Sequence, residues 1–212
     1  MKREEKNQQT RRRIMDSALM EFAQRGYGGS SVNNICAAQG VSKGIIYHYF
    51  DSKDELYLSC VEECFQLLTE HLRTRVPAPE GPVQKQLEDY FACRMDFFRM
   101  HPVYQPIFCE AVINPPSNLQ EAIRACKRGF DRLNADVLTG VLGGAPLRAG
   151  LRAEAVVEDF RMYMDYFNLR FRSAFRSGYS IDEILTAHET KCRRQLDILL
   201  HGVLEDRNEE AT

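Results

Sequence analysis

Apolar side chains recur along the chain at intervals of three and four residues, and Gly, Pro and Ser residues separate the periodic segments. This spacing places apolar side chains on one face of an α-helix, whereas a half-buried strand would alternate apolar and polar positions. The pattern therefore predicts an all-α protein of about nine helices. We expect a three-helix amino-terminal domain over residues 1–53 and a helical carboxy-terminal bundle over residues 54–212.

The first two predicted helices have recognisable start and stop signals. Thr10 is placed to cap the first helix, and the glycine-rich stretch Gly26–Gly29 ends it. Ser31 is placed to cap the second helix, which ends at Gly40 because glycine readily adopts the left-handed conformation of a helix C-terminus. The inward face of the first helix comprises Ile14, Ala18, Leu19 and Phe22.

A short third helix and a long fourth helix follow. Ser42 can cap the third helix, which is predicted from Lys43 to about Tyr49. Ser52 and Glu55 fit the S-x-x-E capping box that opens the fourth helix, and Pro77 lies just beyond its end. At roughly 1.5 Å per residue the fourth helix is about 35 Å long, which is enough to join the two predicted domains.

Five further helices are predicted in the rest of the chain. A proline inside a helix removes a backbone donor, so Pro106 means that the sixth helix either starts near Tyr104 or is kinked. The last two helices are apolar over more than one side, which predicts a homodimer formed through them. The remaining helices are expected from Pro82 to His101, after a Ser117 capping box, from about Ala153 to Arg176, and after a Ser180 capping box.

Charge is distributed unevenly, although the formal net charge of the chain is only −2. Residues 1–53 carry nine Lys and Arg against five Asp and Glu, which is a net +4. The remaining residues carry nineteen against twenty-five, which is a net −6. A basic segment followed by an acidic one fits a local contact with nucleic acid.

Cysteine usage and the chain start bear on the compartment. The seven cysteines are scattered and include no C-x-x-C pair, so a disulfide scaffold is not expected. The amino terminus, MKREEKNQQTRRR, lacks the apolar run of a signal peptide, and no later apolar segment is long enough to span a bilayer. These features predict a cytoplasmic protein without a membrane partner.

Gly40-Val41-Ser42-Lys43-Gly44, Tyr47-His48-Tyr49-Phe50 and Lys53 follow one another at fixed spacing around the predicted third helix. With these residues, the segment from Thr10 to about Leu56 resembles the DNA-binding domain of the TetR family of bacterial transcriptional regulators. Ser31 stands where threonine is common in that family, and Cys36 stands where alanine is common. The rest of the chain is similar to the family's ligand-binding and dimerisation body only in helix count and proline breaks. The residues that match, at unbroken spacing, are Thr10, Ile14, Ala18, Phe22, Gly26-Tyr27, Ser31-Val32, Ile35, Gly40-Val41-Ser42-Lys43-Gly44, Ile46, Tyr47-His48-Tyr49-Phe50, Lys53 and Leu56.

The resemblance implies a helix-turn-helix domain that binds double-stranded operator DNA. It also implies a homodimer on a palindromic operator and a small-molecule effector that releases it, which is the behaviour of a repressor. Tyr47, His48, Tyr49 and Lys53 match positions that commonly touch DNA in the family, whereas Ile46 and Phe50 match core positions.

Ten residues are expected to form the DNA-binding surface. Lys43 can donate to guanine or phosphate oxygens, and Gly44 lets the backbone approach the groove closely. Ile45 can touch a thymine methyl group, and Lys53 lies at the positive end of the fourth helix, where phosphate is favoured. The full set is Ser31, Asn33, Ser42, Lys43, Gly44, Ile45, Tyr47, His48, Tyr49 and Lys53.

The effector site is expected in the carboxy-terminal body, where aromatic residues predict an apolar or aromatic ligand. Packing in an ordinary core is the alternative for each candidate residue. The candidate lining residues are Phe91, Met95, Phe98, Tyr104, Phe108, Tyr163 and Phe167, and the candidate orienting groups are His101, Glu110 and Asn168.

The sequence also offers alternatives to a DNA-binding regulator. Cys60 with Cys64, and His188 with Cys192, lie one helical turn apart and raise the hypothesis of thiol or metal sensing, but cysteine is a common core residue. The sequence has no H-E-x-x-H, G-x-S-x-G or phosphate-loop motif, so an enzyme is not expected, and neither are catalytic residues, a metal or a cofactor. A protein-interaction adaptor with a vestigial DNA-binding domain is the remaining alternative.

Overall fold

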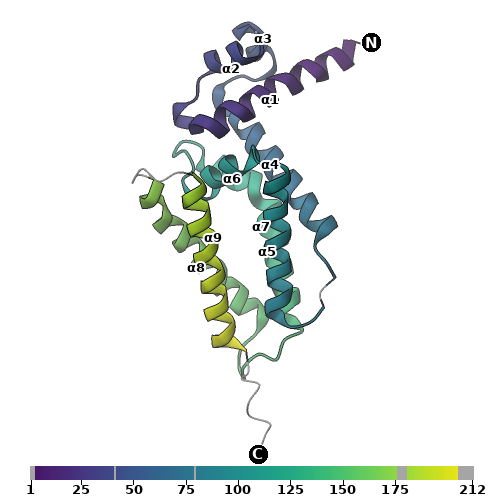
Figure 1. Ribbon diagram of the computed structural model, residues 1–212, viewed down its shortest axis with the longest axis vertical. Coiled ribbons are helices and arrows are strands. Elements are labelled where there is room, and N and C mark those ends of the chain that lie inside the picture. The colour runs from purple at the N-terminus through teal and green to yellow at the C-terminus, as the bar shows by residue number, and fades with distance from the viewer. Residues whose placement is uncertain (1–2, 41, 79, 176–180, 205–212) are drawn as a thin grey trace, which may run out of the picture. The chain divides into compact units, whose positions relative to one another are not determined.

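The computed structural model describes residues 3–40, 42–78, 80–175 and 181–204. Within these ranges the chain forms nine helices and no β-strand, which confirms the predicted all-α fold (Figure 1). The helices are α1 (Arg3–Gly29), α2 (Val32–Gln39), α3 (Lys43–Tyr49), α4 (Lys53–Arg75), α5 (Val83–Met100), α6 (Tyr104–Ile113), α7 (Gln120–Gly143), α8 (Ala153–Phe175) and α9 (Ile181–Val203).

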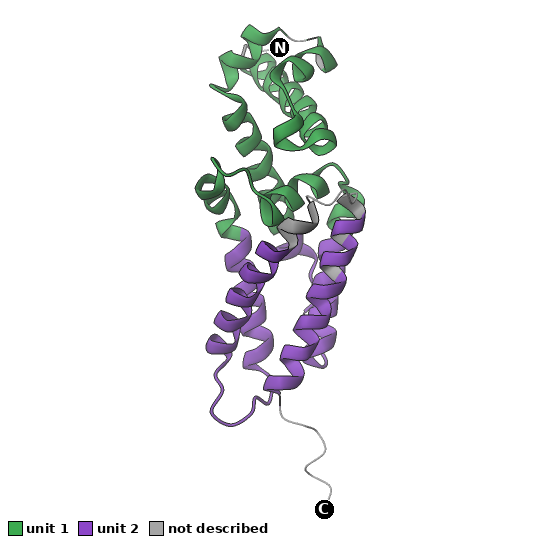
Figure 2. Ribbon diagram, turned by 90° about the vertical axis from the view of Figure 1, so that its left-hand side faces the viewer, with its two compact units in different colours: residues 1–70, 96–129 green, residues 71–95, 130–212 purple. Residues whose placement is uncertain are grey.

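The chain divides into two compact units, coloured separately in Figure 2. Unit 1 comprises Met1–Glu70 and Asp96–Gly129, and unit 2 comprises His71–Met95 and Phe130–Thr212. The boundary falls inside helices α4, α5 and α7, and α6 belongs to the same unit as the first three helices. The division into functional domains after residue 53 stays a prediction.

Helix α1 packs against both α2 and α6 within unit 1. Its predicted inward face is confirmed, since Ile14, Ala18, Leu19 and Phe22 are all at most 3% exposed. The Phe22 ring meets the Tyr57 ring of α4 edge to face, with centroids 5.0 Å apart. Burial of these aromatic and aliphatic side chains is the main source of stability for the unit.

The predicted start of α1 was wrong. The helix begins at Arg3, and the Thr10 hydroxyl donates to the Lys6 carbonyl oxygen from inside the helix (2.9 Å) instead of capping it. The preceding residues are mostly good helix formers, and Glu4 and Glu5 complement the helix dipole in the first turn. The predicted glycine-rich ending appears as a kink at Gly26, where φ is 64°.

The predicted capping signals around the turn are confirmed. Ser31 and Ser42 cap α2 and α3, because their hydroxyl oxygens accept the N–H groups of residues three positions later. Gly40 closes α2 in the left-handed conformation, with φ 61°. The Glu55 N–H donates to the Ser52 hydroxyl (3.1 Å), as expected at the start of α4.

The later helix limits follow the sequence signals with two differences. Helix α6 begins at Tyr104, so Pro106 lies in its first turn and one of the two alternatives is confirmed. Helix α7 begins at Gln120 instead of directly after Ser117, because the intervening residues form turns. The predicted Arg176 end of the eighth helix and the Ser180 cap of the ninth lie outside the described residues.

Unit 2 is a helical bundle in which α8 and α9 pack side by side (Figure 1). A buried hydrogen-bonded pair lies between α5 and α7, where the Tyr90 hydroxyl donates to the Asn134 side-chain oxygen. In the described part of the chain, no helix is both long and apolar enough to cross a membrane. The core is formed by Leu87, Leu138, Val141, Leu142, Val156, Val157, Leu196 and Leu200.

Candidate nucleic-acid interface

Helix α3 has one buried face and one exposed face. Ile46 and the following Phe50 are each 1% exposed, which confirms the expectation that they pack in the core. Ile45 and Tyr47 are 42% and 43% exposed, although both are large apolar or aromatic residues. A short helix that buries only Ile46 and exposes large apolar side chains on its other side is suited to contact something outside the unit.

The exposed face of α3 combines charge, hydrogen-bonding tips and apolar surface. The Lys43 ammonium lies 5.8 Å from the centroid of the Tyr47 ring, so the two side chains cover neighbouring parts of the helix. His48 is exposed, and its ring lies 5.1 Å from that of the half-buried Tyr49. Ser42 is also exposed, at the amino end of the helix.

Gly44 is exposed in the first turn of α3, and a Cβ atom added there would meet no other atom within 4 Å. Its φ is not in the left-handed region, so the backbone does not require glycine. Glycine in a helix is less stable than alanine by roughly 0.5–1 kcal/mol. Neither packing nor backbone conformation within the described chain therefore explains glycine at this position.

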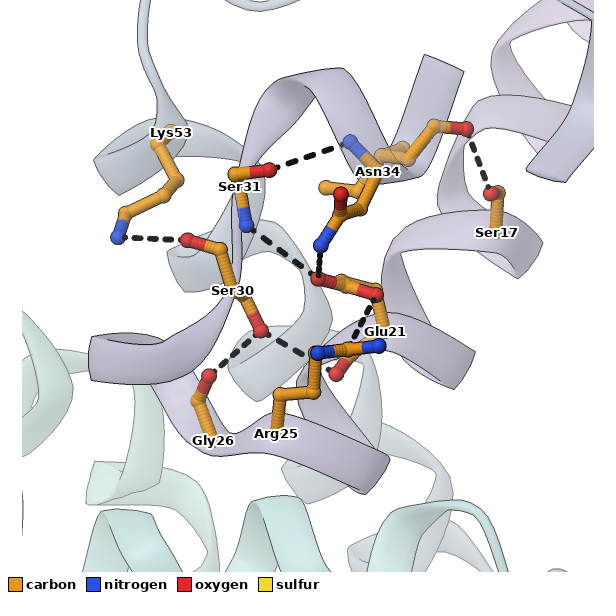
Figure 3. Close-up of polar contacts among 9 residues, drawn as sticks. Ser17, Glu21, Arg25, Gly26, Ser30, Ser31, Asn34 and Lys53 are labelled. Carbon is orange, nitrogen blue, oxygen red and sulfur yellow. Dashed lines mark hydrogen bonds and ion pairs between the residues drawn. The ribbon is translucent and has the colours of Figure 1, made fainter. Parts of the chain in front are cut away.

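The amino end of α2 is held by a carboxylate from α1 (Figure 3). The Glu21 side chain, 11% exposed, accepts the Ser31 N–H at 3.3 Å and the Asn34 side-chain N–H at 2.8 Å. Ser31 is partly buried, and its hydroxyl oxygen accepts the Asn34 N–H, whereas Asn33 is exposed. Sequence inspection did not identify Glu21 and Asn34 as this support, although a lone acidic residue beside an apolar stripe was a usable signal.

Lys53 lies at the start of α4 and is partly buried. Its ammonium donates to the carbonyl oxygens of Tyr27 (2.9 Å) and Ser30 (3.3 Å) and lies 4.1 Å from the centroid of the Tyr27 ring. An ammonium group has three donors, and two are engaged here. Lys53 therefore has a structural role in joining α4 to the end of α1, and one donor is left for a phosphate.

Each of the ten sequence-predicted DNA-contact residues lies in α2, α3, the first turn of α4 or their caps, all within unit 1. Seven are exposed, and Ser31, Tyr49 and Lys53 are partly buried. The arrangement supplies a cation, hydroxyl and imidazole groups, helix N-termini, and an apolar side chain, Ile45, that can contact a thymine methyl group. These are the groups that hold phosphates and read base edges in the major groove.

The candidate effector residues fall into two groups, one in each unit. In unit 1, Phe98, Tyr104 and Phe108 are at most 9% exposed, and the Phe98 and Phe108 rings lie 5.0 Å apart. His101 is exposed, and its ring lies 5.1 Å from that of Phe97. This group is a packed aromatic core in the structure.

In unit 2, Tyr163 and Phe167 stack with ring centroids 6.1 Å apart. The Asn168 side-chain oxygen lies 2.7 Å from His188 Nε2, and the His188 ring lies 5.0 Å from Phe167. Phe91 and Met95 of α5 are half-buried in the same unit. A surface pocket of about 500 Å³ on α9 is lined by other residues, so the effector site stays a prediction.

The two pairs that raised the hypothesis of thiol or metal sensing differ in their surroundings. Cys60 and Cys64 are fully buried, and burial raises the pKa of both thiols. Because the thiolate is the reactive and metal-binding form, a raised pKa disfavours both chemistries. The Cys192 sulfur lies 3.7 Å from His188 Nδ1, and among the described residues no group of three or more candidate metal ligands comes together.

Comparison with known proteins adds independent information about the interface. The family model of bacterial regulatory proteins of the tetR family matches residues 14–60, which span most of α1 to the first part of α4. The biofilm operon negative transcriptional regulator IcaR of Staphylococcus epidermidis is 32% identical over 60 residues. That alignment covers 28% of this chain and 32% of IcaR, so the chain matches about a third of that relative's length.

A longer match extends over both units. The transcriptional repressor AcnR of Corynebacterium efficiens is 26% identical over 193 residues, which are 87% of this chain and 93% of AcnR. The crystal structure of a TetR family transcriptional regulator from Chloroflexus aurantiacus has the same fold, with a TM-score of 0.59 and 21% identity over 94% of this chain and 95% of that one. Together with the exposed face of α3, these matches identify residues 14–60 as a DNA-binding domain of the tetR-family type, and they show that the chain as a whole has the fold of TetR family transcriptional regulators.

Proposed function

We propose that this regulator is a ligand-responsive repressor that binds a palindromic operator as a homodimer and leaves it when an apolar or aromatic effector binds. The observation that carries the DNA-binding part is the exposed face of α3, with Ile45 and Tyr47 above 40% exposure beside Lys43 and His48. Repression is supported by the relatives, because IcaR is named a negative regulator and AcnR a repressor.

The proposed contacts are of two kinds: some position the domain on the DNA, and others recognise the base sequence. Ser31, Ser42 and the third donor of Lys53 hold phosphates, which fixes the register of the domain on the duplex. Lys43, Tyr47 and His48 reach base edges from α3, Ile45 meets a thymine methyl group, and Gly44 allows the close approach. Asn33 and Tyr49 lie at the margins of this surface and contact the sugar-phosphate backbone.

The proposed homodimer uses the outer faces of α8 and α9. Met162, Tyr166 and Leu169 are 56%, 61% and 55% exposed, and their spacing of four and three residues places them in one stripe on α8. Ile198 on α9 is 53% exposed. Large apolar side chains exposed in a row on packed helices favour burial against a second copy, because a closed pair buries the same patch on each subunit.

The proposed effector binds in the carboxy-terminal body. The Tyr163 and Phe167 rings with the Asn168–His188 pair provide an aromatic surface with one oriented polar group, which is the lining expected for an apolar or aromatic ligand. Replacing Phe167 by Ala should then weaken the response to a ligand identified by screening while leaving operator affinity in its absence unchanged.

Selection of duplexes from a randomised library by the purified full-length protein tests the proposal. The expected product is a palindrome whose half-sites lie about 34–36 Å apart centre to centre, or a multiple of this distance, because a two-fold dimer presents two α3 helices to one face of the duplex. Enrichment of a single non-repeated half-site would contradict the dimer. Failure to enrich any duplex would refute the function itself.

A further inference from the structure

A single carboxylate on α6 joins this helix to the end of α1. Both oxygens of Glu110 lie 3.0 Å from the backbone nitrogen of Tyr27, which donates its N–H to them. The Tyr57 hydroxyl of α4 donates to the same carboxylate at 2.9 Å. All three residues belong to unit 1, so the one charged side chain of α6 contacts both α1 and α4.

The α1 backbone is shaped to allow this contact. Gly26 has φ 64°, and a Cβ atom built there would lie 3.0 Å from a carboxylate oxygen of Glu110. An L-residue would meet both an unfavourable backbone conformation and this oxygen. The kink at Gly26 takes the Tyr27 N–H out of the regular helix ladder, where an acceptor from outside α1 satisfies it.

Further hydrogen bonds link the end of α1 to the start of α4 and to the amino end of α2. The carbonyl oxygens of Tyr27 and Ser30 accept from the Lys53 ammonium at the start of α4. The Ser30 hydroxyl lies 2.6 Å from the Gly26 carbonyl oxygen and 3.2 Å from that of Glu21. The Glu21 carboxylate in turn holds the amino end of α2 (Figure 3).

Two neighbouring contacts also link residues at either end of α6 to α4 and α1. The Asn118 side chain, just before α7, donates to Asp54 at 3.1 Å, and Asp54 also accepts from the Tyr27 hydroxyl. At the other end of α6, the Tyr104 hydroxyl donates to Glu63, which forms an ion pair with Arg12 of α1. Glu110 lies between these two contacts in the sequence and is the one that meets the backbone of the α1 kink.

An ionised carboxylate is not the most stable choice at this position. Burial raises the pKa of Glu110. This rise is only partly offset by the hydrogen bonds from the Tyr27 N–H and the Tyr57 hydroxyl and by the charge of Lys53. A neutral side chain of similar size would avoid this desolvation cost, since buried charges often contribute less to stability than neutral replacements. The charge is therefore better explained by a contribution to positioning than by one to stability.

We propose that Glu110 is a positioning residue for DNA reading: it fixes the α1 kink at Tyr27, and through Lys53 and Glu21 it sets the orientation in which α2 and α3 meet the duplex. The inference rests on the proposed binding of an operator, and it assigns the positioning of the α1 kink to the hydrogen bond between the Tyr27 N–H and the Glu110 carboxylate.

The contact is tested first without DNA, by nuclear magnetic resonance of the full-length protein. The Tyr27 amide proton is expected far downfield and should shift with pH as Glu110 titrates, at a pH above the ordinary range of a glutamate. The groups facing this site are Tyr27, Lys53, Asp54 and Tyr57, so the Glu110→Gln variant identifies the titrating group by abolishing the shift. An identical titration in that variant would overturn the assignment.

Operator affinity tests the role of the contact. Using the duplex that the wild-type protein selects, Glu110→Ala should bind about tenfold more weakly, the value of one hydrogen bond to a charged group. Glu110→Gln keeps an acceptor without the charge, so it should recover part of this loss. Tyr90→Phe is the matched control, because it removes a buried hydroxyl contact in unit 2 and should leave affinity unchanged.

Stability separates positioning from simple loss of folding. The Gln variant should be as stable as the wild type or more stable at neutral pH, yet bind DNA more weakly. If Glu110→Ala does not fold, the comparison of Glu110→Gln with the wild type decides whether Glu110 has a positioning role. Equal operator affinity of the Gln variant and the wild type would overturn the role of Glu110, whereas failure of the wild-type protein to select any duplex would refute the proposed function.

Discussion

Replacing Gly44 by Ala should change stability and DNA affinity in opposite directions. The added methyl group meets no atom of the described chain within 4 Å, and the backbone at this position is helical. The free energy of unfolding should rise by about 0.5 kcal/mol, the lower end of the glycine-to-alanine difference, because Gly44 lies in the first helical turn. For a chain of this size, this corresponds to an increase in Tm of roughly 1–2 °C.

The same methyl group should weaken DNA binding if α3 enters the major groove with its Gly44 side against the duplex. Inserting one carbon into a close-packed contact costs about 1–3 kcal/mol, which is a loss of affinity of roughly 5- to 150-fold. Fluorescence anisotropy with the selected duplex and urea denaturation of the free protein measure the two effects on the same preparation.

A matched glycine provides the control. Gly129 lies inside α7, and a Cβ atom there also meets nothing within 4 Å. Gly129→Ala should raise stability by about 1 kcal/mol, the mid-helix value, without changing DNA affinity. If Gly44→Ala binds the duplex as tightly as the wild type, the close approach of α3 is refuted, and if it destabilises the protein, the open space beside Gly44 is refuted.

Three further predictions address the phosphate contacts, the buried carboxylate and the dimer. Lys53→Ala should lower operator affinity and reduce the slope of log affinity against log salt by about one, measured by salt titration, and an unchanged slope would exclude the phosphate contact. Burial raises the pKa of Glu110, so the folded protein holds this proton more tightly than the unfolded chain does. The stability of the wild type should therefore fall relative to that of Glu110→Gln as the pH rises from below the ordinary glutamate pKa through the raised one. Urea denaturation of both proteins across this pH range checks the sign, and parallel curves of stability against pH would contradict it. Leu169→Asp, on the exposed stripe of α8, should halve the mass found by light scattering and abolish tight operator binding, whereas an unchanged mass would place the interface elsewhere.

Local signals in the sequence were sufficient for the helix-turn-helix region. Ser31, Gly40 and Ser42 determine the limits of α2 and α3 by capping and by left-handed backbone geometry, which depend on a few neighbouring residues. The core positions of Ile46 and Phe50 followed from matching a family pattern at fixed spacing. The start of α1 was missed because a threonine that can cap a helix can also bond back to the preceding turn.

The tertiary structure alone revealed what surrounds the charged side chains. By sequence, Glu110 was a candidate to orient an effector, and Lys53 was a cation at a helix end, because a residue type does not show which distant atoms it meets. Folding brings Glu110 to the amide of Tyr27, 83 positions away, and brings Lys53 to the carbonyl oxygens at the end of α1. Such contacts depend on how whole helices pack. Helix limits, which are local, could therefore be read from the sequence, whereas the link between α6 and the DNA-reading helices could not.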